Sequence, residues 1–241
     1  MESWEYHRAQ DLHLRSGESV KSIRREVGLP GVLLALMKRP VLQLYLKGFH
    51  GLRINGKQNL PDRYPFVLVS NHSSHLDAVI LSSLVPVPLS FRLFPIAAGD
   101  TFFESFVTSA LASWFMNALP LWRRKVVTHS IESLRERVVS EPCGYIVFPE
   151  GTRTRTGFLN SFKPGVGKLV AGQDVPIIPC FIDGAFEALP SHRRFPYPKK
   201  ISIEIGEAFR PEQVPNSKQG WLYIASELQK RIESLSTKQA V

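Results

Sequence analysis

Two short motifs in this chain of 241 residues carry side chains that can do chemistry. The first runs from Asn71 through His72 to Asp77, which places the carboxylate five residues after the imidazole. On a continuous helix these two side chains would point about 140° apart and would not meet. If His72 lies in a turn and Asp77 in the first turn of the following helix, the carboxylate can fold back onto the ring. That pair would make His72 a general base whose tautomer is fixed by Asp77.

A structural interpretation of the same motif competes with the catalytic one. Ser74 and Asp77 have the spacing of a helix N-cap box, and an acidic side chain is favourable at a helix N-terminus. His75 is a second imidazole within the motif. The spacing alone therefore gives weak support for catalysis.

The second motif is richer in charge and contains a glycine. Residues 148–155 read Phe-Pro-Glu-Gly-Thr-Arg-Thr-Arg, and Lys163 follows in Phe-Lys-Pro-Gly. Two arginines and a lysine near the backbone N–H groups of such a loop can grip a phosphate. Glu150 can hold an arginine in position or accept a hydrogen bond from a substrate hydroxyl. A polar loop with solvated charges would have the same composition.

Both motifs are predicted to follow strands of an α/β fold. Apolar runs bounded by turn residues predict buried strands over 66–69 and 145–148, with further strands over 91–97, 175–182 and 201–205. Helices are expected over 77–84, 102–119, 126–139 and 221–235. This alternation predicts a single layered domain with a mostly buried mixed sheet flanked by helices. Strand ends are a usual place for working groups in such folds.

An N-terminal amphipathic helical segment is expected before this domain. Val20, Ile23 and Val27 recur at helical spacing, and residues 32–49 favour a helix pair broken or kinked at Pro40. An apolar face with basic flanks suits a helix at the level of lipid headgroups, and packing on the protein's own core explains it equally well. The predicted division is a membrane-interfacial segment over residues 1–50 and a domain over residues 51–241.

Composition narrows the classes of partner. The chain has 30 Lys and Arg against 21 Asp and Glu, a formal net charge of +9, which favours nucleic acid, anionic lipid or phosphorylated substrates. Apolar runs are shorter than the roughly 20 residues that a spanning helix needs, and the polar N-terminus is unlike a secretory signal. The two cysteines lack the spacing of metal ligands, so no metal site is expected.

A basic and aromatic stretch lies late in the chain. Arg193, Arg194, Lys199 and Lys200 surround Phe195 and Tyr197. This stretch suits contact with anionic lipid headgroups or with an acidic acyl carrier protein. A solvated charged loop is the competing interpretation.

Four blocks together resemble the glycerolipid acyltransferases of the lysophosphatidate (1-acyl-sn-glycerol-3-phosphate) acyltransferase type. That family carries Asn-His-four residues-Asp, an arginine block, Phe-Pro-Glu-Gly-Thr-Arg and Val-Pro-Ile-Ile-Pro. The chain has them in this order at residues 71–77, 118–123, 148–153 and 175–179. The resemblance covers about residues 45–210, and its third block is specific.

The resemblance implies transfer of a fatty acyl group from acyl-CoA or acyl carrier protein to the hydroxyl of a lysophospholipid in phospholipid biosynthesis, with 1-acyl-glycerol-3-phosphate as the expected acceptor. His72, oriented by Asp77, would take the hydroxyl proton, and the oxygen would attack the thioester without an acyl-enzyme intermediate. The implied substrate-binding residues are Arg123, Glu150, Gly151, Thr152, Arg153 and Lys163. No metal or bound cofactor is implied. The expected location is peripheral, at the cytoplasmic face of a membrane with anionic lipids.

Two departures from the family pattern leave the acceptor headgroup open. Many phosphatidate-forming members carry a lysine where this chain reads Ala97-Ala98-Gly99-Asp100. An acidic residue often precedes the arginine of the second block, where this chain has Trp122. Another lysolipid or lipid-like alcohol is therefore an alternative acceptor.

Three other classes of protein fit the sequence less well. A serine hydrolase would need a nucleophile elbow, and the chain has no Gly-x-Ser-x-Gly. A nucleic-acid-binding module would explain the charge but not the Phe-Pro-Glu-Gly-Thr-Arg block, and no aromatic-basic signature is present. A non-catalytic lipid-binding protein of the same fold is the strongest rival, and the intact His72 and Asp77 argue against it.

Overall fold

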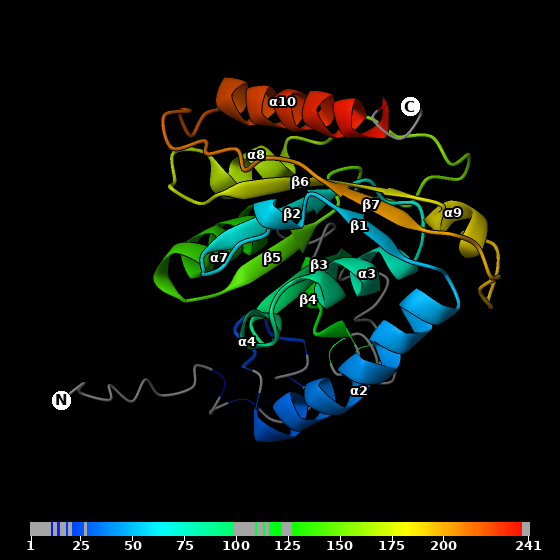
Figure 1. The fold of residues 1–241 in the computed structure, drawn as a ribbon. Coiled ribbons are helices and arrows are strands. Elements are labelled where there is room, and N and C mark those ends of the chain that lie inside the picture. The colour runs from blue at the N-terminus through cyan, green and yellow to red at the C-terminus, as the bar shows by residue number, and fades with distance from the viewer. Residues whose placement is uncertain are drawn as a thin grey trace.

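The computed structural model describes residues 11, 14, 18, 21–26, 28–98, 109, 113, 116–121 and 127–237 (Figure 1). Its centre is one seven-stranded sheet in the order β1-β7-β6-β2-β5-β3-β4. The strands are β1 (Arg53–Asn55), β2 (Phe66–Ser70), β3 (Leu93–Ala98), β4 (Leu119–Leu121), β5 (Gly144–Val147), β6 (Ile177–Asp183) and β7 (Ser202–Ile205). The predicted α/β fold with a mixed sheet is confirmed.

Neighbouring strands are parallel except for β6 and β7, which run antiparallel. In the middle of the sheet β2 pairs with β5 on one side and β6 on the other, so that Val67 lies between Tyr145 and Ile177. Because β2 and β5 are parallel neighbours, their carboxyl ends meet at one edge of the sheet. The loops that carry the two motifs therefore start side by side.

Both faces of the sheet are covered, which explains why β2 is apolar at successive positions. Phe66 and Leu68 point into one core cluster, and Val67 and Val69 point into the other. All five residues of β2 are buried. A strand covered on both faces loses the usual alternation of polar and apolar residues.

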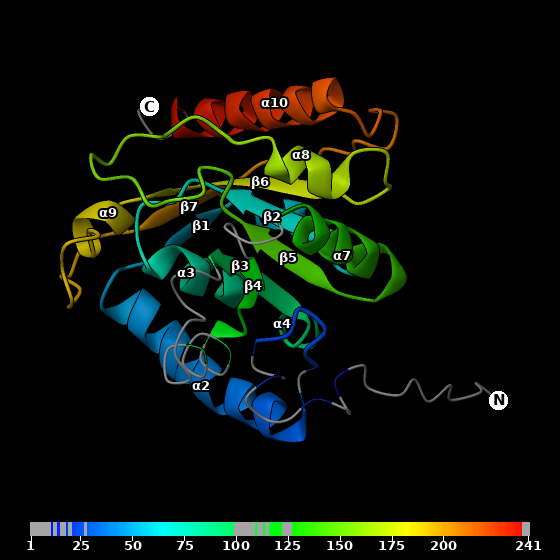
Figure 2. The same cartoon turned by 180° about the vertical axis from the view of Figure 1, so that it is seen from behind.

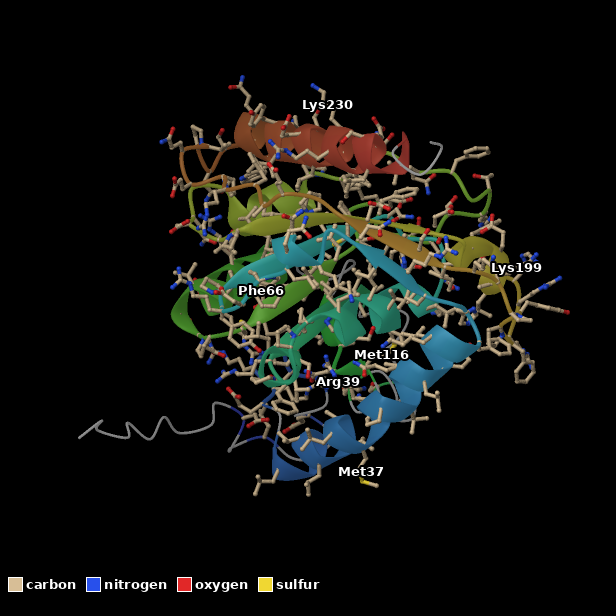
Figure 3. All side chains as sticks on the ribbon, viewed as in Figure 1. Met37, Arg39, Phe66, Met116, Lys199 and Lys230 are labelled. Carbon is tan, nitrogen blue, oxygen red and sulfur yellow. The ribbon has the colours of Figure 1, made fainter. Side chains whose placement is uncertain are left out.

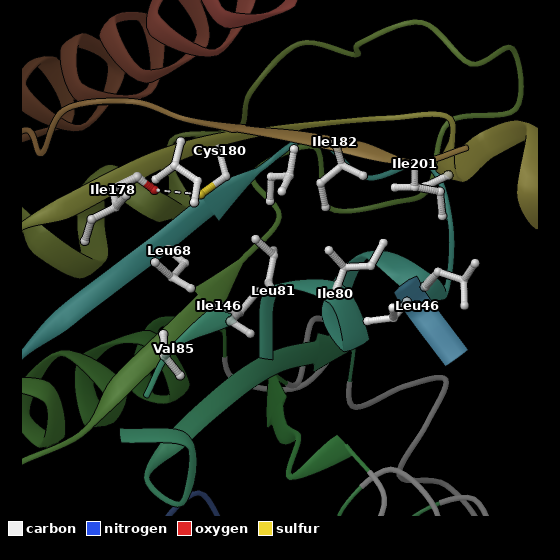
Figure 4. Close-up of a cluster of buried hydrophobic side chains, with 14 of the residues drawn as sticks. Leu46, Leu68, Ile80, Leu81, Val85, Ile146, Ile178, Cys180, Ile182 and Ile201 are labelled. Atoms are coloured by element: carbon white, nitrogen blue, oxygen red, sulfur yellow. Dashed lines mark hydrogen bonds between the residues drawn. The ribbon is translucent and has the colours of Figure 1, made fainter. Parts of the chain in front are cut away.

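The first cluster lies between the sheet and the helices α2 (Leu29–Gly48), α3 (Leu76–Leu84), α4 (Val87–Ser90) and α9 (Ala185–Ala188). Figure 4 shows part of it, with Leu46 of α2 and Ile80 and Leu81 of α3 beside Leu68 and Ile146 of the sheet. The second cluster packs under α7 (Val127–Ser140), α8 (Gly165–Val170) and α10 (Lys218–Thr237). Figures 1 and 2 show α10 and α2 on opposite sides of the molecule.

The predicted helix pair, broken or kinked at Pro40, is one helix, because α2 contains Pro40 and is not broken there. A proline removes one hydrogen bond from a helix. Contacts of the neighbouring residues with the rest of the protein hold α2 together. Arg39 donates through Nη2 to the backbone oxygen of Ser83 at 3.3 Å and to that of Val85. Leu46 is buried in the first cluster, so the end of α2 is fixed on the core.

The helical pattern around Ile23 is also not realised in residues 21–26, which form turns. Arg137 of α7 donates hydrogen bonds to backbone oxygens of this segment. Its Nη2 donates to the backbone oxygen of Arg25 at 3.0 Å, and its Nη1 donates to that of Ile23. These bonds satisfy carbonyl groups that a helix would otherwise use. Most of the expected helix over 102–119 lies outside the described residues.

The other predicted helices are confirmed within a few residues, at 76–84 for α3, 127–140 for α7 and 218–237 for α10. Short elements were not predicted. They are strands β1 and β4, helices α4, α8 and α9, and the 3-10 helix η1 (Lys57–Asn59).

Candidate active site

The two motifs lie together at the carboxyl edge of the sheet. Residues 71–75 leave β2 and lead into α3, and residues 148–163 leave β5. The backbone N–H of Thr154 donates to the backbone oxygen of His72 at 2.9 Å. The loops are therefore bonded directly to each other.

His72 and Asp77 meet as the sequence predicts. Nδ1 of His72 lies 3.0 Å from Oδ2 of Asp77, and the aspartate side chain is fully buried whereas the imidazole is 21% exposed. Because a carboxylate accepts, the ring proton sits on Nδ1 and the lone pair on Nε2. A partly exposed imidazole whose Nε2 has no hydrogen-bond partner among the described residues has the arrangement of a general base.

The same carboxylate also holds the turn that begins α3. Oδ2 of Asp77 accepts from the backbone N–H of Ser73 at 2.7 Å and of Ser74 at 2.8 Å. The structural interpretation of the motif is thus also realised. Three N–H donors converge on one oxygen, so the backbone fixes the carboxylate that in turn orients His72.

Phe148 fixes the plane of the imidazole from the second motif. Its ring stacks on that of His72 with centroids 4.0 Å apart and an angle of 15° between the planes. The stacking complements the in-plane bond to Asp77, so His72 is constrained in two directions.

Glu150 is buried and bonds to the backbone of the first motif. Oε1 accepts from the N–H of His72 at 2.6 Å, and Oε2 accepts from the backbone N–H and the Nδ2 of Asn160 at 3.0 and 2.8 Å. Burial raises the pKa of Glu150, and these hydrogen bonds oppose the rise. Among the described contacts Glu150 thus holds N–H groups of His72 and Asn160 rather than an arginine.

Arg153 presents a hydrogen-bond donor without a partner. Its Nη1 is buried and forms no hydrogen bond within the described part of the chain. Burial lowers the pKa of Arg153, and the charge of Asp77 opposes that change. A buried, unsatisfied guanidinium nitrogen is costly unless an anion accepts from it.

Lys163 reaches the turn at Gly151. Its backbone N–H donates to Pro149 at 2.9 Å, and its Nζ lies 2.9 Å from where a Cβ on Gly151 would be. Gly151 has φ of +73°, so both its backbone and its surroundings favour glycine. Arg153 and Lys163 are thus two cations around one loop, as predicted. Thr152 on this loop is exposed, and the predicted residue Arg123 lies outside the described residues.

The second imidazole of the motif, His75, differs from His72 in its environment. Burial, with the charges of Arg153 and His72, lowers the pKa of His75 to about 4. This ring is therefore neutral near pH 7.

The sequence did not predict the roles of two residues that hold the motifs in place, Asn71 and Asn160. Asn71 makes paired bonds with the backbone of Ile182 in β6, donating to its oxygen and accepting from its N–H, each at 2.8 Å. Asn160 bonds Glu150 from ten residues away. The polar residue directly after a buried strand was a signal for Asn71, and the sequence carries no signal for Asn160.

A cavity of about 1140 Å³ opens beside the first turn of α3. Leu76 and Ala78, which flank Asp77, belong to its lining. Its other walls come mainly from apolar residues of α2, α3, the turn between α4 and β3, and the segment before β4, including Leu34, Leu42, Val79, Phe91 and Met116. Figure 3 shows Arg39 and Met116 in this lower part of the molecule, between α2 and the sheet.

The chain is similar to known proteins in sequence and in fold. Residues 51–183 match the Acyltransferase family. The chain is 27% identical over 185 residues, 73% of its length, to mouse 1-acyl-sn-glycerol-3-phosphate acyltransferase alpha. It is 31% identical over 146 residues, 59% of its length, to the chloroplastic 1-acyl-sn-glycerol-3-phosphate acyltransferase LPAT1 of Arabidopsis thaliana.

A solved structure has the same fold. The crystal structure of the 1-acyl-sn-glycerophosphate acyltransferase PlsC from Thermotoga maritima superposes with a TM-score of 0.65 at 21% identity, covering 88% of this chain and 79% of that one. Among the curated relatives, the matched region spans 63% of the mouse protein and 39% of the Arabidopsis protein.

Proposed function

Because the chain belongs to the Acyltransferase family, we propose that it is an O-acyltransferase that moves a fatty acyl group from a thioester to the hydroxyl of 1-acyl-glycerol-3-phosphate in phospholipid biosynthesis. The observation that carries this proposal is the hydrogen bond between Nδ1 of His72 and Oδ2 of Asp77 at 3.0 Å, near Arg153, whose Nη1 is buried and has no hydrogen-bond partner in the described part of the chain. The names of the relatives supply the acceptor.

In the proposed reaction, Nε2 of His72 takes the proton of the acceptor hydroxyl as its oxygen attacks the thioester carbonyl. The carbon–sulfur bond then breaks, and the departing sulfur takes the proton from the imidazolium. Asp77 stabilises the imidazolium between these two steps. General base catalysis of this kind contributes about 10²–10⁴-fold in rate. A thioester is already an activated acyl group, so the proposed reaction uses neither a metal nor a bound cofactor.

The acceptor phosphate is proposed to bind at the loop after β5. Arg153 offers its unpartnered Nη1, and Lys163 adds a second cation beside Gly151. Arg123 is proposed to approach the same phosphate, in keeping with the resemblance. Glu150 is proposed to position His72 through its backbone N–H rather than to bind substrate.

An acyl chain is proposed to occupy the cavity beside α3. Its lining is mainly apolar and includes Leu76 and Ala78, which flank Asp77 in the sequence. An apolar cavity of this kind binds chains by removing their methylene groups from water, at about 0.8 kcal/mol for each.

The protein is proposed to lie peripherally on the cytoplasmic face of a membrane. The part of the chain that the structure describes contains no helix long and apolar enough to cross a bilayer. One side of α2 exposes a row of large apolar side chains at helical spacing: Leu29, Leu33, Leu36, Met37, Val41 and Leu44. Its other side carries the buried Leu46. A helix with an exposed apolar side suits the boundary between headgroups and acyl chains.

A division of the chain into an interfacial segment at residues 1–50 and an acyltransferase domain at residues 51–241 remains part of the proposal. The family match begins at residue 51. Leu42 and Leu46 of α2 pack on the core of the second part, so the two parts share one hydrophobic core.

An acceptor panel tests the proposed function. Thiol release from acyl-CoA and from acyl carrier protein would be followed with 1-acyl-glycerol-3-phosphate, with lysophospholipids of other headgroups, and with a simple long-chain alcohol. Turnover that is fastest with 1-acyl-glycerol-3-phosphate supports the proposal. Faster turnover with another acceptor would change the proposed headgroup. If lysolipids bound but no acceptor of the panel led to thiol release, the chain would be a lipid-binding protein instead.

A further inference from the structure

The loop between α9 and β7 exposes an unusual combination of side chains. Residues 193–200, the basic aromatic loop, carry the exposed cations Arg193, Arg194, Lys199 and Lys200 together with Phe195 and Tyr197. Phe195 is 80% exposed. Residues 188–200 contain no Asp or Glu, so nothing in this stretch neutralises the four cations.

The backbone of the basic aromatic loop is fixed in its middle and at its C-terminal end. The backbone N–H of Tyr197 donates to the backbone oxygen of Ala188 at 2.7 Å, and that of Ile201 donates to the backbone oxygen of His50 at 3.0 Å. Nδ1 of His50 lies 3.0 Å from the backbone oxygen of Lys199. These bonds hold the loop while leaving its side chains in water, so the exposure of Phe195 is a built feature of the surface.

The basic aromatic loop is continuous with the apolar side of α2. His50, which holds the loop, also bonds the hydroxyl of Tyr45 at 2.9 Å, and the ring of Tyr45 stacks on Phe49 with centroids 5.3 Å apart. Figures 1 and 2 show the loop beside the C-terminal end of α2 in both views. The exposed apolar row of α2 thus ends where the cationic loop begins.

The same loop is tied to the candidate active site. Oγ of Ser74, two residues after His72, donates to the backbone oxygen of Leu189 at 2.9 Å. Leu189 directly follows α9 and precedes the loop. The segment that leads into the basic aromatic loop is therefore bonded directly to the first motif.

We propose that the basic aromatic loop is a second lipid-contact site, which binds the anionic headgroup layer through its four cations and inserts Phe195 beside the apolar side of α2. The four cations would be attracted to the phosphates of anionic lipids. An exposed aromatic ring next to an apolar helix would be buried at the boundary below the headgroups. An acidic protein surface would satisfy the cations but would leave the apolar side of α2 uncovered. The membrane is therefore the favoured partner, and contact at both elements would keep the first motif, which is bonded to Leu189, near the bilayer that supplies the acceptor.

This proposal rests on the peripheral location proposed above, and vesicle binding tests it without any acyl transfer. The full chain would be sedimented with vesicles of phosphatidylcholine alone and with vesicles containing phosphatidylglycerol. Two variants would be compared with the wild type. The first, the charge-reversed loop, combines Arg193→Glu, Arg194→Glu, Lys199→Glu and Lys200→Glu. The second carries the single change Phe195→Ser. The matched control changes α10 on the opposite side, with Lys218→Glu, Lys230→Glu and Tyr223→Ser; Figure 3 shows Lys230 far from Lys199.

The charge-reversed loop is expected to lose about tenfold or more of its affinity for anionic vesicles and to keep its weaker binding to neutral ones. Phe195→Ser is expected to weaken binding to both, and the α10 control is expected to bind as the wild type does. Wild-type affinity for anionic vesicles in both loop variants would overturn the proposal. If the charge-reversed loop bound vesicles normally but used acyl carrier protein poorly while using acyl-CoA well, the loop would be a carrier-protein site instead. Turnover of detergent-dispersed substrates, measured in parallel, reports on the catalytic proposal independently.

Discussion

The backbone N–H of His72 donates to Oε1 of Glu150 at 2.6 Å, which joins two loops that are 78 residues apart in the chain. The glutamate is only 3% exposed, and its other oxygen holds Asn160. The position of the base thus depends on the loop that is proposed to bind phosphate. Hydrogen bonds thus couple the positions of the two loops, and this relationship makes the following variants informative.

Glu150→Gln should lower kcat about tenfold to a hundredfold with little change in the KM for either substrate. The amide would bring an N–H group against the N–H of His72 or those of Asn160, and a lost hydrogen bond to a charged group costs roughly 1.5–3 kcal/mol. Steady-state kinetics would measure the effect. Asn160→Ala is the matched control, because it removes one bond to Oε2 and leaves the backbone bond. If Glu150→Gln raised the acceptor KM and left kcat unchanged, Glu150 would be a substrate ligand.

Asp77→Asn should lower kcat by about 10²–10⁴-fold while the protein stays folded. The amide oxygen can still accept from the N–H groups of Ser73 and Ser74, so the turn is retained, but the charge that stabilises the imidazolium is lost. Single-turnover acyl transfer, with circular dichroism as the folding control, measures both. A variant that kept full activity would show that Asp77 only caps α3.

Arg153→Ala should raise the acceptor KM about tenfold or more and leave the KM for the acyl thioester unchanged. Its unpartnered Nη1 is proposed to meet the acceptor phosphate, and hydrogen bonds to charged groups contribute roughly 1.5–3 kcal/mol. Arg153→Lys should recover only part of the loss, because an ammonium lacks the planar fork. Arg155→Ala, at an exposed position of the same loop, is the control. Equal effects at positions 153 and 155 would indicate general electrostatics rather than a specific ligand.

His75 should make the folded state less stable as the pH falls from about 6.5 towards 4. Burial is the main cause that lowers its folded pKa to about 4, from the ordinary histidine pKa of about 6.5. Between these values the unfolded chain binds a proton that the folded protein does not, so the free energy of unfolding decreases as the pH falls. Urea unfolding at several pH values would show a shallower dependence for His75→Gln than for the wild type. Identical dependence in both proteins would show that His75 titrates normally in the folded state.

The sequence predicted the central strands because their apolar runs are bounded by turn residues, and it placed His72 and Asp77 in contact because both lie within one local turn. Strands β1 and β4 have three residues each, too few for a periodicity to be seen. Pro40 was read as a break because its local cost is clear, whereas the packing of Leu46 that maintains α2 is a tertiary effect. The bond from Glu150 to His72 could not be predicted, since it depends on which strands become neighbours.

The activity of His72→Ala tests the central claim most directly. Release of thiol from acyl-CoA in the presence of 1-acyl-glycerol-3-phosphate would be measured for wild type and variant, with thermal unfolding confirming that both are folded. The proposed mechanism predicts that transfer by the variant falls to the uncatalysed background while the wild type turns over. Transfer by a folded His72→Ala protein at the wild-type rate would contradict it and would remove the imidazole from the reaction.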